Sequence, residues 1–419
     1  MKTYSVVSLG CKVNDYEATY IDEQLSKKFK RVKNDNADIF VIMSCCVTNT
    51  AEAKTRKYIN RIRRENPKSF ICVVGCYSQI KTNNPVFENV DLIVGSKDKN
   101  KVPSYIFERI KGNLVKDNKK YKFESMFINE YPDKSRAFLK IQDGCNQFCS
   151  YCIIPYARGN ERSENHNKII KNAKVLSKKY KEIVLTGIHT GRYNDGEYNL
   201  YDLLSELNTI KELETIRLSS IEINELTDEI IDLIAKSNKI AHHLHIPVQS
   251  LNNSILKSMN RHYTIEQFKK RVNYIRKMIP DISISTDLIV GFAGESEEIF
   301  NTFFKQLDII KFSFIHVFPY SIKDGTKAAQ MKGQVDEHIK KERVNKIIKY
   351  QSSIMDKYKR KFIKKYQEVL IEKTDNEYSY GYSKNYMYSK IKGQFPIGDI
   401  VKVKYTDYKD NIMIGEYVS

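Results

Sequence analysis

The chain has 419 residues, enough for two or three domains. Its apolar runs are all shorter than the roughly 18 residues of a membrane span, and its N-terminus does not have the pattern of a secretion signal. Its 70 Lys and Arg residues outnumber its 51 Asp and Glu residues, and the formal charge of +19, although partly a lysine-rich composition, favours nucleic acid as a partner. We therefore expect a soluble, cytoplasmic protein without a membrane partner, whose eight cysteines are reduced and serve metal binding or catalysis rather than disulfides.

The first part of the chain alternates short, β-branched apolar runs with amphipathic helical patterns. The apolar runs predict strands over residues 3–10, 37–44, 70–75 and 91–96. Helical patterns lie between them, and this βαβα order is typical of an open, doubly wound parallel sheet. We expect such a domain over residues 1–115.

A polar, irregular stretch near 111–134 indicates a linker, and a second alternating series follows it. Six further strands are predicted, over residues 136–141, 182–188, 215–220, 241–248, 282–292 and 312–320. Six βα units are two short of a closed barrel. We therefore expect an open, partial (β/α)6 barrel as a central domain over residues 131–356.

The end of the chain changes character after a long basic helical pattern over residues 333–366. Short strands rich in Tyr and Lys are predicted over residues 367–373, 386–391, 399–405 and 411–418. Turn residues separate these strands, as in a small β-barrel. We expect this barrel over residues 357–419, which gives an α/β protein with a C-terminal β-barrel.

Three cysteines lie close together after the first strand of the central domain. Cys145, Cys149 and Cys152, the central trio, have the spacing C-x3-C-x2-C. A structural zinc site uses four protein ligands, and a simple electron-carrying iron–sulfur cluster normally uses four thiolates. A trio leaves one coordination position open for chemistry. The alternative is a zinc site completed by His189 or His245.

A second set of cysteines lies in the first domain. Cys11, Cys45 and Cys76, the N-terminal trio, each follow the end of a predicted parallel strand. Because the carboxyl ends of such strands share one edge of a sheet, the three thiols are expected to converge and to bind one face of a cluster. Cys46 is an alternative to Cys45, since two adjacent side chains point in different directions. Cys72 lies inside a strand and is expected to be an inert core residue.

Other polar runs have ordinary explanations. The three histidines of HHLH (242–245) alternate along a strand, which is more typical of mixed core and surface positions than of a metal site. The basic runs RIRR (61–64) and KYKRKFIKKY (357–366) could contact phosphates, but such runs are more often solvated helix faces.

The segment GCNQFCSYC (144–152) resembles the radical S-adenosylmethionine superfamily. The resemblance implies that the central trio binds three irons of a 4Fe–4S cluster and that S-adenosylmethionine chelates the fourth. It also implies that reductive cleavage of the sulfonium yields a 5′-deoxyadenosyl radical. The cluster and its cosubstrate would thus supply the chemistry, and the protein would orient them.

The whole chain further resembles the methylthiotransferase family. The motifs that carry this resemblance are SLGCKVND (8–15), SCCVTNTAEAKTR (44–56), VVGCYSQ (73–79), LTGIHTGRY (185–193), RLSSIEI (217–223), HIPVQS (245–250), STDLIVGF (285–292) and HVFPYS (316–321). LGCKVN most resembles the branch that acts on N6-threonylcarbamoyladenosine at tRNA position 37. The chain departs from the family pattern at Met43, Cys46, Leu251 and Ala293, none of which removes a cluster ligand.

This resemblance implies methylthiolation of C2 of the modified adenosine with two 4Fe–4S clusters, the second held by the N-terminal trio as the sulfur site. It implies no catalytic residues beyond the cluster cysteines. Contacts to S-adenosylmethionine are expected from strand-end residues whose alternative role is ordinary turn or helix-cap structure. These residues are Gly187, Gln249, Ser250, Ser285, Asp287 and Gly291.

The implied partners are the anticodon stem-loop of tRNA, a low-potential electron donor such as a flavodoxin or ferredoxin, and a sulfur donor. The C-terminal Tyr and Lys residues suit base stacking and phosphate contact. Two alternatives stay open: methylthiolation of a ribosomal-protein aspartate, and a non-catalytic, metal-stabilised RNA-binding protein.

Overall fold

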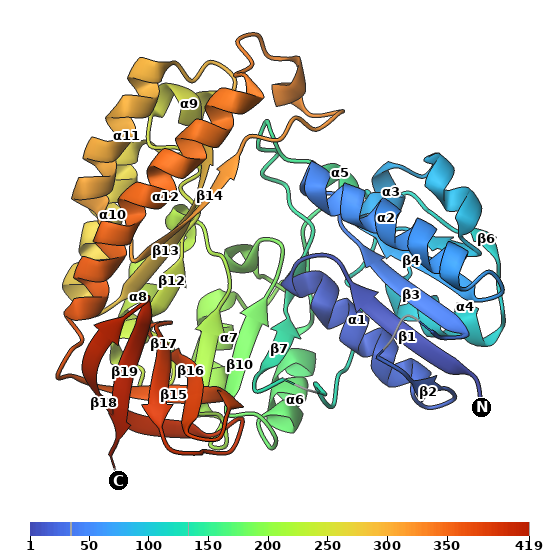
Figure 1. Cartoon of the computed structure of the whole chain (residues 1–419), viewed down its shortest axis with the longest axis horizontal. Helices are drawn as coiled ribbons and strands as arrows, with labels where there is room; N and C mark the ends of the chain where they lie inside the picture. Colours follow the sequence, from blue (N-terminus) through green and yellow to red (C-terminus); the bar gives the residue numbers. More distant parts are fainter. Residues whose placement is uncertain (34–35, 133, 419) are drawn as a thin grey trace.

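The computed structural model describes residues 1–33, 36–132 and 134–418. Asp133 of the expected linker and Ser419 at the end of the expected barrel lie outside these residues. Figure 1 shows an N-terminal α/β part, a central sheet covered by helices, and a C-terminal barrel beneath that sheet. None of the helices in the described ranges is long and apolar enough to cross a membrane.

The N-terminal part is a parallel sheet of six strands in the order β2-β1-β3-β4-β5-β6. The strands are β1 (Thr3–Ser8), β2 (Lys30–Arg31), β3 (Ile39–Ser44), β4 (Phe70–Gly75), β5 (Leu92–Val94) and β6 (Gly112–Asn113). The helices are α1 (Lys12–Leu25), α2 (Asn49–Glu65), α3 (Cys76–Ile80) and α4 (Val102–Phe107). The predicted doubly wound sheet is confirmed, and β3, a strand in the middle of its order, is buried along its whole length.

The central part contains the six predicted strands, all parallel. They are β7 (Ala137–Lys140), β10 (Glu182–Thr186), β11 (Thr215–Leu218), β12 (His243–His245), β13 (Ser283–Val290) and β14 (Phe314–Pro319). Single bridges from Ile216 to Ile240 and from Ser220 to His245 join the two halves into one curved sheet. Within the described residues no pairing joins β7 to β14, so the expected open barrel is confirmed.

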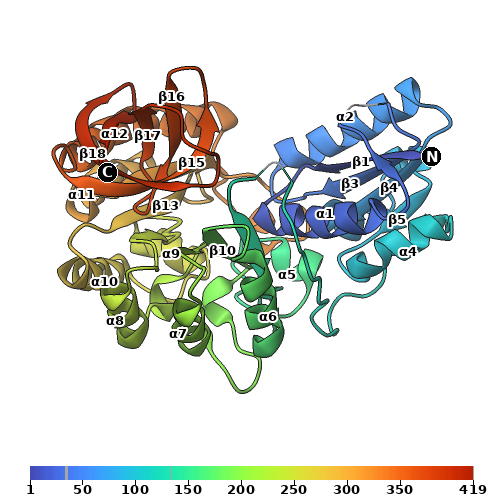
Figure 2. The same ribbon diagram turned by 90° about the horizontal axis from the view of Figure 1, so that it is seen from below.

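Helices cover the outer side of this sheet, as Figure 2 shows from below. They are α6 (His166–Leu176), α7 (Leu200–Thr209), α8 (Asp228–Lys236), α10 (Ile265–Met278), α11 (Glu297–Ile310) and α12 (Glu337–Arg360). The helix expected over 333–366 is thus shorter, because the side chain of Asp336 caps its start by accepting a hydrogen bond from the His338 N–H. Two short helices, α5 (Ile154–Arg158) and α9 (Asn253–Ser258), lie in connections at the carboxyl ends of the strands.

The expected linker begins with β6, which pairs with β5 and extends the N-terminal sheet. The described residues 114–132 then form neither helix nor strand. The segment is nevertheless anchored, because Met126, Ile128 and Tyr131 are buried in the central core. The connection between the two parts is therefore packed against the protein rather than free in solvent.

The C-terminal part is a closed barrel in the order β15-β16-β17-β19-β18. Its strands are β15 (Tyr366–Thr374), β16 (Tyr378–Ser383), β17 (Tyr388–Lys392), β18 (Ile400–Lys409) and β19 (Ile412–Tyr417). β16 was not predicted, because its inward positions carry Ser379, Gly381 and Ser383 instead of aliphatic residues. A Cβ at Gly381 would lie only 1.8 Å from the Leu370 carbonyl oxygen, so this close pairing requires glycine.

Candidate functional site

The central trio lies on the loop between β8 (Gln142–Asp143) and α5. Backbone hydrogen bonds close this loop, from the Cys145 N–H to the Gly159 carbonyl and from the Cys152 N–H to the Cys149 carbonyl. The three thiols are close enough to interact electrostatically, and burial together with the neighbouring Cys149 and Cys145 raises the pKa of Cys152 to about 12. The loop therefore presents three converging sulfur atoms, each partly exposed.

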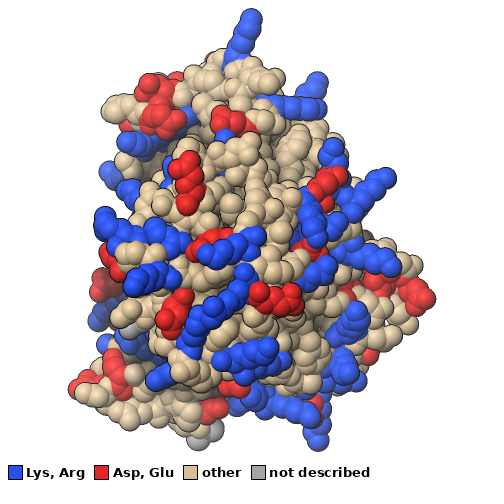
Figure 3. All heavy atoms as spheres, turned by 90° about the vertical axis from the view of Figure 1, so that its right-hand side faces the viewer, with Lys and Arg blue, Asp and Glu red and all other residues tan. Residues whose placement is uncertain are grey.

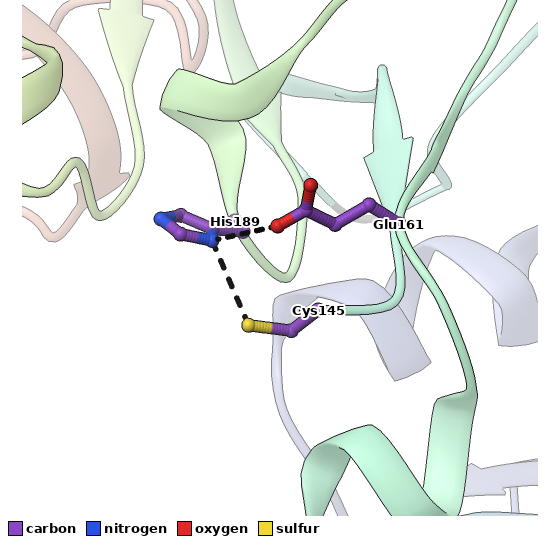
Figure 4. A group of neighbouring side chains, drawn as sticks. All are labelled: Cys145, Glu161 and His189. Carbon is purple, nitrogen blue, oxygen red and sulfur yellow. Dashed lines mark hydrogen bonds and ion pairs between the residues drawn. The ribbon is translucent and has the colours of Figure 1, made fainter. Parts of the chain in front are cut away.

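Distant parts of the central domain contact this loop. Figure 4 shows His189 between Cys145 and Glu161, with its Nδ1 3.6 Å from the Cys145 sulfur and 3.5 Å from a Glu161 oxygen. Burial opposes the charged imidazole, but these contacts and the ion pair with Glu225 raise the pKa of His189 to about 12. Cys145, Glu161 and His189 each place one possible ligand atom within 4.8 Å of the others, so a zinc site completed by this histidine stays an alternative.

The other histidine proposed as a zinc ligand lies elsewhere. His245 accompanies Asp287 and His316 in a separate group of possible ligand atoms. On the opposite side of the thiol loop, Arg261 donates a hydrogen bond from Nη1 to the Cys149 sulfur at 3.5 Å. Arg261 is itself buried and paired with Glu222, so it places one fixed positive charge beside the trio.

The N-terminal trio lies at the carboxyl edge of the first sheet, as expected from the strand ends. Cys11 is the N-cap of α1, Cys45 follows β3, and Cys76 begins α3. Gly75 precedes Cys76 with φ +118°, and a Cβ there would lie 2.8 Å from the Ser44 carbonyl oxygen, so the turn from β4 into α3 requires glycine. Burial raises the pKa of both Cys11 and Cys45, and neighbouring thiols raise it further: Cys76 acts on both, and Cys11 acts on Cys45. The three sulfur atoms therefore lie close enough to interact.

Cys46 lies beside the same group. A hydrogen bond from Cys46 and the positive charge of Arg158 both lower the pKa of Cys76, whereas burial raises it. The net result is a pKa of about 6. Cys46 is completely buried in a hydrophobic cluster, whereas Cys45 interacts with both Cys11 and Cys76. The choice of Cys45 as ligand stays a prediction. Cys72 is buried in the core, away from the strand ends, as expected.

A buried charge network connects the two thiol sites. Glu17 on α1 contacts Lys99 at 2.5 Å, Lys140 at 2.7 Å and Arg158 at 3.0 Å. Asp143 pairs with Lys140 at 2.8 Å and with Arg158 at 3.0 Å. Arg158 ends α5, directly after the central trio, and its charge favours the thiolates of the N-terminal trio. The network therefore fixes one thiol site relative to the other.

The residues expected to contact S-adenosylmethionine do not form one group. Gly187 follows β10 and packs against Gln142, whereas the Gly291 N–H donates to a Glu295 oxygen. Ser250 is completely buried. Gln249 pairs with Leu288 in an isolated bridge.

The remaining two residues of that set, Ser285 and Asp287, lie on β13 beside His245. The Ser285 hydroxyl is within 3.1 Å of His243 and 3.0 Å of His245, and Asp287 lies 3.3 Å from the other nitrogen of His245. Ser285 lines a cavity of about 480 Å³ that no sequence motif predicted. The walls of this cavity come from all three parts of the chain, including Lys12, Arg217, Leu218, His243, His245, Ser283, Ser285, His316, Tyr382, Tyr386 and Tyr388.

Sequence reasoning also missed Arg158 and Arg261, two buried arginines whose charges act on the thiols. Arg158 lies six residues after Cys152 in CSYCIIPYAR, and a buried arginine so close to three cysteines has no periodic signal of its own. Arg261 lies in an irregular connection more than a hundred residues from the loop it contacts, so only the folded chain brings the two together.

Two family models match the chain. Residues 3–95 match the Uncharacterized protein family UPF0004, and residues 139–307 match the Radical SAM superfamily. Among solved structures, the radical S-adenosylmethionine methyltransferase TsrM from Kitasatospora setae is similar with a TM-score of 0.57 and 13% identity, over 78% of this chain and 77% of that one. This likeness supports the fold.

Full-length relatives are more similar in sequence. The chain is 43% identical to threonylcarbamoyladenosine tRNA methylthiotransferase MtaB of Bacillus subtilis, over 96% of this chain and 94% of the relative. It is 33% identical to a tRNA-2-methylthio-N(6)-dimethylallyladenosine synthase of Clostridium botulinum, over 99% of this chain and 97% of the relative. With both thiol trios in place and such identity over nearly its whole length, the chain belongs to the radical S-adenosylmethionine methylthiotransferases, enzymes of tRNA modification whose cofactors are 4Fe–4S clusters and S-adenosylmethionine.

Proposed function

We propose that this enzyme methylthiolates C2 of N6-threonylcarbamoyladenosine at position 37 of tRNAs and that it uses two 4Fe–4S clusters. The observation that carries the proposal is the presence of two separate groups of three converging thiols, one in the central domain and one in the N-terminal domain. The substrate follows from the similarity to relatives named for threonylcarbamoyladenosine.

The central trio fits a 4Fe–4S cluster with one iron left for S-adenosylmethionine, because three thiols converge on one loop. When bound, the cluster and S-adenosylmethionine supply the one-electron chemistry that activates an unreactive C–H bond. The chain's part is to hold the thiolates: Arg261 donates to one sulfur, and His189 lies beside another. For the cosubstrate we retain Gly187, Gln249, Ser250, Ser285, Asp287 and Gly291 as candidates.

The N-terminal trio, Cys11, Cys45 and Cys76, fits the second cluster. Arg158 stabilises its thiolates from the buried network, so the site can hold three negative sulfur atoms away from bulk water. We assign this cluster to the sulfur that is transferred. Replacing the C2 hydrogen with a methylthio group requires one S-adenosylmethionine for the methyl group, a second for hydrogen removal, a sulfur donor, and electrons from a donor such as a flavodoxin or ferredoxin.

We place the anticodon stem-loop against the C-terminal barrel over residues 357–419. Tyrosines there lie beside lysines: Lys390 is 3.7 Å from the ring centre of the partly buried Tyr378, and Lys402 is 5.5 Å from that of the exposed Tyr366. Such pairs suit stacked bases and phosphates. Because the substrate would be tRNA, we expect the enzyme to act in the cytoplasm.

The predicted basic runs contribute less. Arg63 of RIRR is occupied by Asp91 at 2.7 Å and by three backbone carbonyls, so it is unsuited to a phosphate. Figure 3, which faces the N-terminal side, shows Lys and Arg spread widely with acidic side chains among them. This face therefore offers general attraction to a polyanion rather than one concentrated patch.

The test is mass spectrometry of tRNA nucleosides from cells that lack the protein. We expect the methylthio form of threonylcarbamoyladenosine to disappear and the unmethylthiolated form to accumulate. Re-expression of the unchanged protein should restore it, whereas variants with alanine at all three positions of either trio should not. Unaltered methylthio-threonylcarbamoyladenosine in the deletion strain would contradict the proposed substrate.

Related measurements distinguish this proposal from the two alternatives, a ribosomal-protein substrate and a non-catalytic RNA-binding protein. If a ribosomal-protein aspartate is the substrate, the modification will be lost from that protein and not from tRNA. A non-catalytic RNA-binding protein does not agree with the family to which the chain belongs. Iron and sulfide analysis of the anaerobically purified protein tests the cluster count, since loss of either trio should remove about half of the iron.

A further inference from the structure

The cavity described above lies where the three parts of the chain meet. Its walls include Lys12 from the N-terminal domain, His243 and Ser285 from the central sheet, and Tyr382 and Tyr386 from the C-terminal barrel. Its volume of about 480 Å³ is within the range of small-molecule sites. Lys12 directly follows Cys11, so the cavity adjoins the N-terminal thiol site.

Three cationic side chains line the cavity, those of Lys12, Arg217 and Lys359. Lys359 donates from its ammonium group to the Asn411 carbonyl oxygen at 2.9 Å. Arg217 lines the wall, but its Nε and Nη2 donate to Glu182 at 3.1 Å, and its Nη1 and Nη2 donate to backbone carbonyls of the C-terminal barrel. Glu182 also pairs with Arg136, which in turn pairs with Glu372, so these four side chains balance one another.

Lys12, by contrast, has no hydrogen-bond or ion-pair partner within the described part of the chain, and its side chain is accessible. The carboxylate whose charge acts on Lys12, that of Glu182, pairs with Arg217 and Arg136 instead. The cavity is therefore ready to accept an anionic group at Lys12.

A buried polar atom and an aromatic wall point to a ligand in the same cavity. His243 is only 7% exposed, and its Nδ1 has no hydrogen-bond partner among the described residues. Its ring stacks on Tyr386 at 4.8 Å, Tyr386 stacks on Tyr382 at 4.6 Å, and Tyr382 contacts Tyr388 at 5.0 Å. This series of rings runs from the surface of the C-terminal barrel into the cavity, an arrangement suited to a splayed nucleobase.

We propose that this cavity receives the modified adenosine and that Lys12 binds the carboxylate of its threonylcarbamoyl group. The inference rests on the proposed function and adds to it a specificity-determining residue. Of the two modified adenosines named for the relatives, threonylcarbamoyladenosine carries a carboxylate and dimethylallyladenosine carries an apolar chain. An unpaired ammonium group suits the first and would be left without a partner by the second.

The test measures binding of two synthetic anticodon stem-loops to the reconstituted enzyme under anaerobic conditions. One loop carries threonylcarbamoyladenosine at position 37, and the other carries its carboxamide, which is uncharged and of nearly equal size. We expect the unchanged enzyme to bind the carboxylate loop about 10- to 100-fold more tightly, the usual worth of a charged hydrogen bond. Lys12→Met should bind both loops as weakly as the unchanged enzyme binds the carboxamide.

Three controls make the result specific. Lys12→Arg should keep the preference, because it keeps the charge. Lys27→Met removes an exposed lysine just past the end of the same helix and should change nothing. Iron and sulfide content of each variant shows whether the neighbouring Cys11 still holds its cluster.

Equal binding of the two loops by the unchanged enzyme, or a preference that survives in Lys12→Met, would overturn the inference. Turnover with the carboxylate loop is measured in parallel. An enzyme that prefers this loop but does not methylthiolate it would contradict the proposed function and leave the assignment of Lys12 intact.

Discussion

The two trios each bring three thiols together, but the chain does so in different ways. The central trio lies within one loop, and its three cysteines span eight residues between β8 and α5. The N-terminal trio comes from three strand ends that are separated by 34 and 31 residues in the chain. The loop arranges its thiols by local backbone hydrogen bonds, whereas the second site depends on the parallel register of β1, β3 and β4.

The charged groups around the two trios also differ, being local at the central trio and spread over two domains at the N-terminal trio. A single buried arginine, Arg261, donates directly to a sulfur of the central trio. The N-terminal trio instead lies beside a charge network that includes Glu17, Lys99 and Arg158 and that joins two domains. A site made by one loop can tolerate changes elsewhere, whereas a site made by topology should fail when the packing of its domain fails.

The largest expected effect is therefore on the network. Glu17→Gln leaves Lys99, Lys140 and Arg158 buried with Asp143 as their shared carboxylate. We expect a loss of about 3–5 kcal/mol in the free energy of unfolding at neutral pH, together with loss of iron from the N-terminal site. Chemical denaturation and iron analysis measure both. Glu65→Gln, on the exposed surface of the same domain, should cost less than about 1 kcal/mol.

The same variant makes a prediction about pH. Burial opposes the charge on Glu17, but Arg158, Lys140 and Lys99 outweigh it and hold its pKa well below the ordinary value of 4.5. The carboxylate therefore contributes its full stability above pH 4.5 and loses it as the pH falls toward the lowered pKa. The stability gap between the unchanged enzyme and Glu17→Gln should narrow below pH 4.5, and a constant gap would contradict this role.

A smaller and more local effect is expected at the central trio. Arg261→Met removes the hydrogen bond to the Cys149 sulfur and leaves Glu222 without its buried partner. We expect a loss of about 2–3 kcal/mol in stability and lower iron occupancy of the central site only. The measurement is made in a background without the N-terminal trio, so that all iron belongs to the central site. The same substitution in a background without the central trio reports the N-terminal site, and an equal loss of iron there would show that the two sites are not independent.

The smallest structural change replaces one sulfur atom and tests which of the adjacent residues Cys45 and Cys46 is the cluster ligand. Cys45→Ser should lose about half of the iron, and Cys46→Ser should keep the iron content of the unchanged enzyme. The reason is that the Cys45 thiol interacts with both Cys11 and Cys76, whereas the thiols that act on Cys46 are those of Cys76 and Cys45. The opposite result would assign the ligand to Cys46.

The sequence predicted what repeats or clusters along the chain. The strands of both parallel sheets could be recognised because they are buried and their residues are apolar. The central trio could be recognised because its three cysteines lie close together in the sequence. The strand-end position of Cys11, Cys45 and Cys76 was recognisable because parallel topology brings such ends together.

The missed features depend on contacts across the fold. β2 and β6 have two residues each and are strands only because a neighbour pairs with them. β16 has small inward residues that give no hydrophobic alternation. Arg158, Arg261 and the cavity at Lys12 are defined by side chains from different domains, and no single window of sequence contains them.

The central sheet ends at β7 on one side and at β14 on the other, and in the described part of the chain no strand closes the wall between them. A complete ring admits only what passes through its mouth. An interrupted ring lets one residue of a long polymer enter sideways while the remainder stays outside. The open side of the barrel therefore suits a substrate that is a single nucleotide within an intact tRNA.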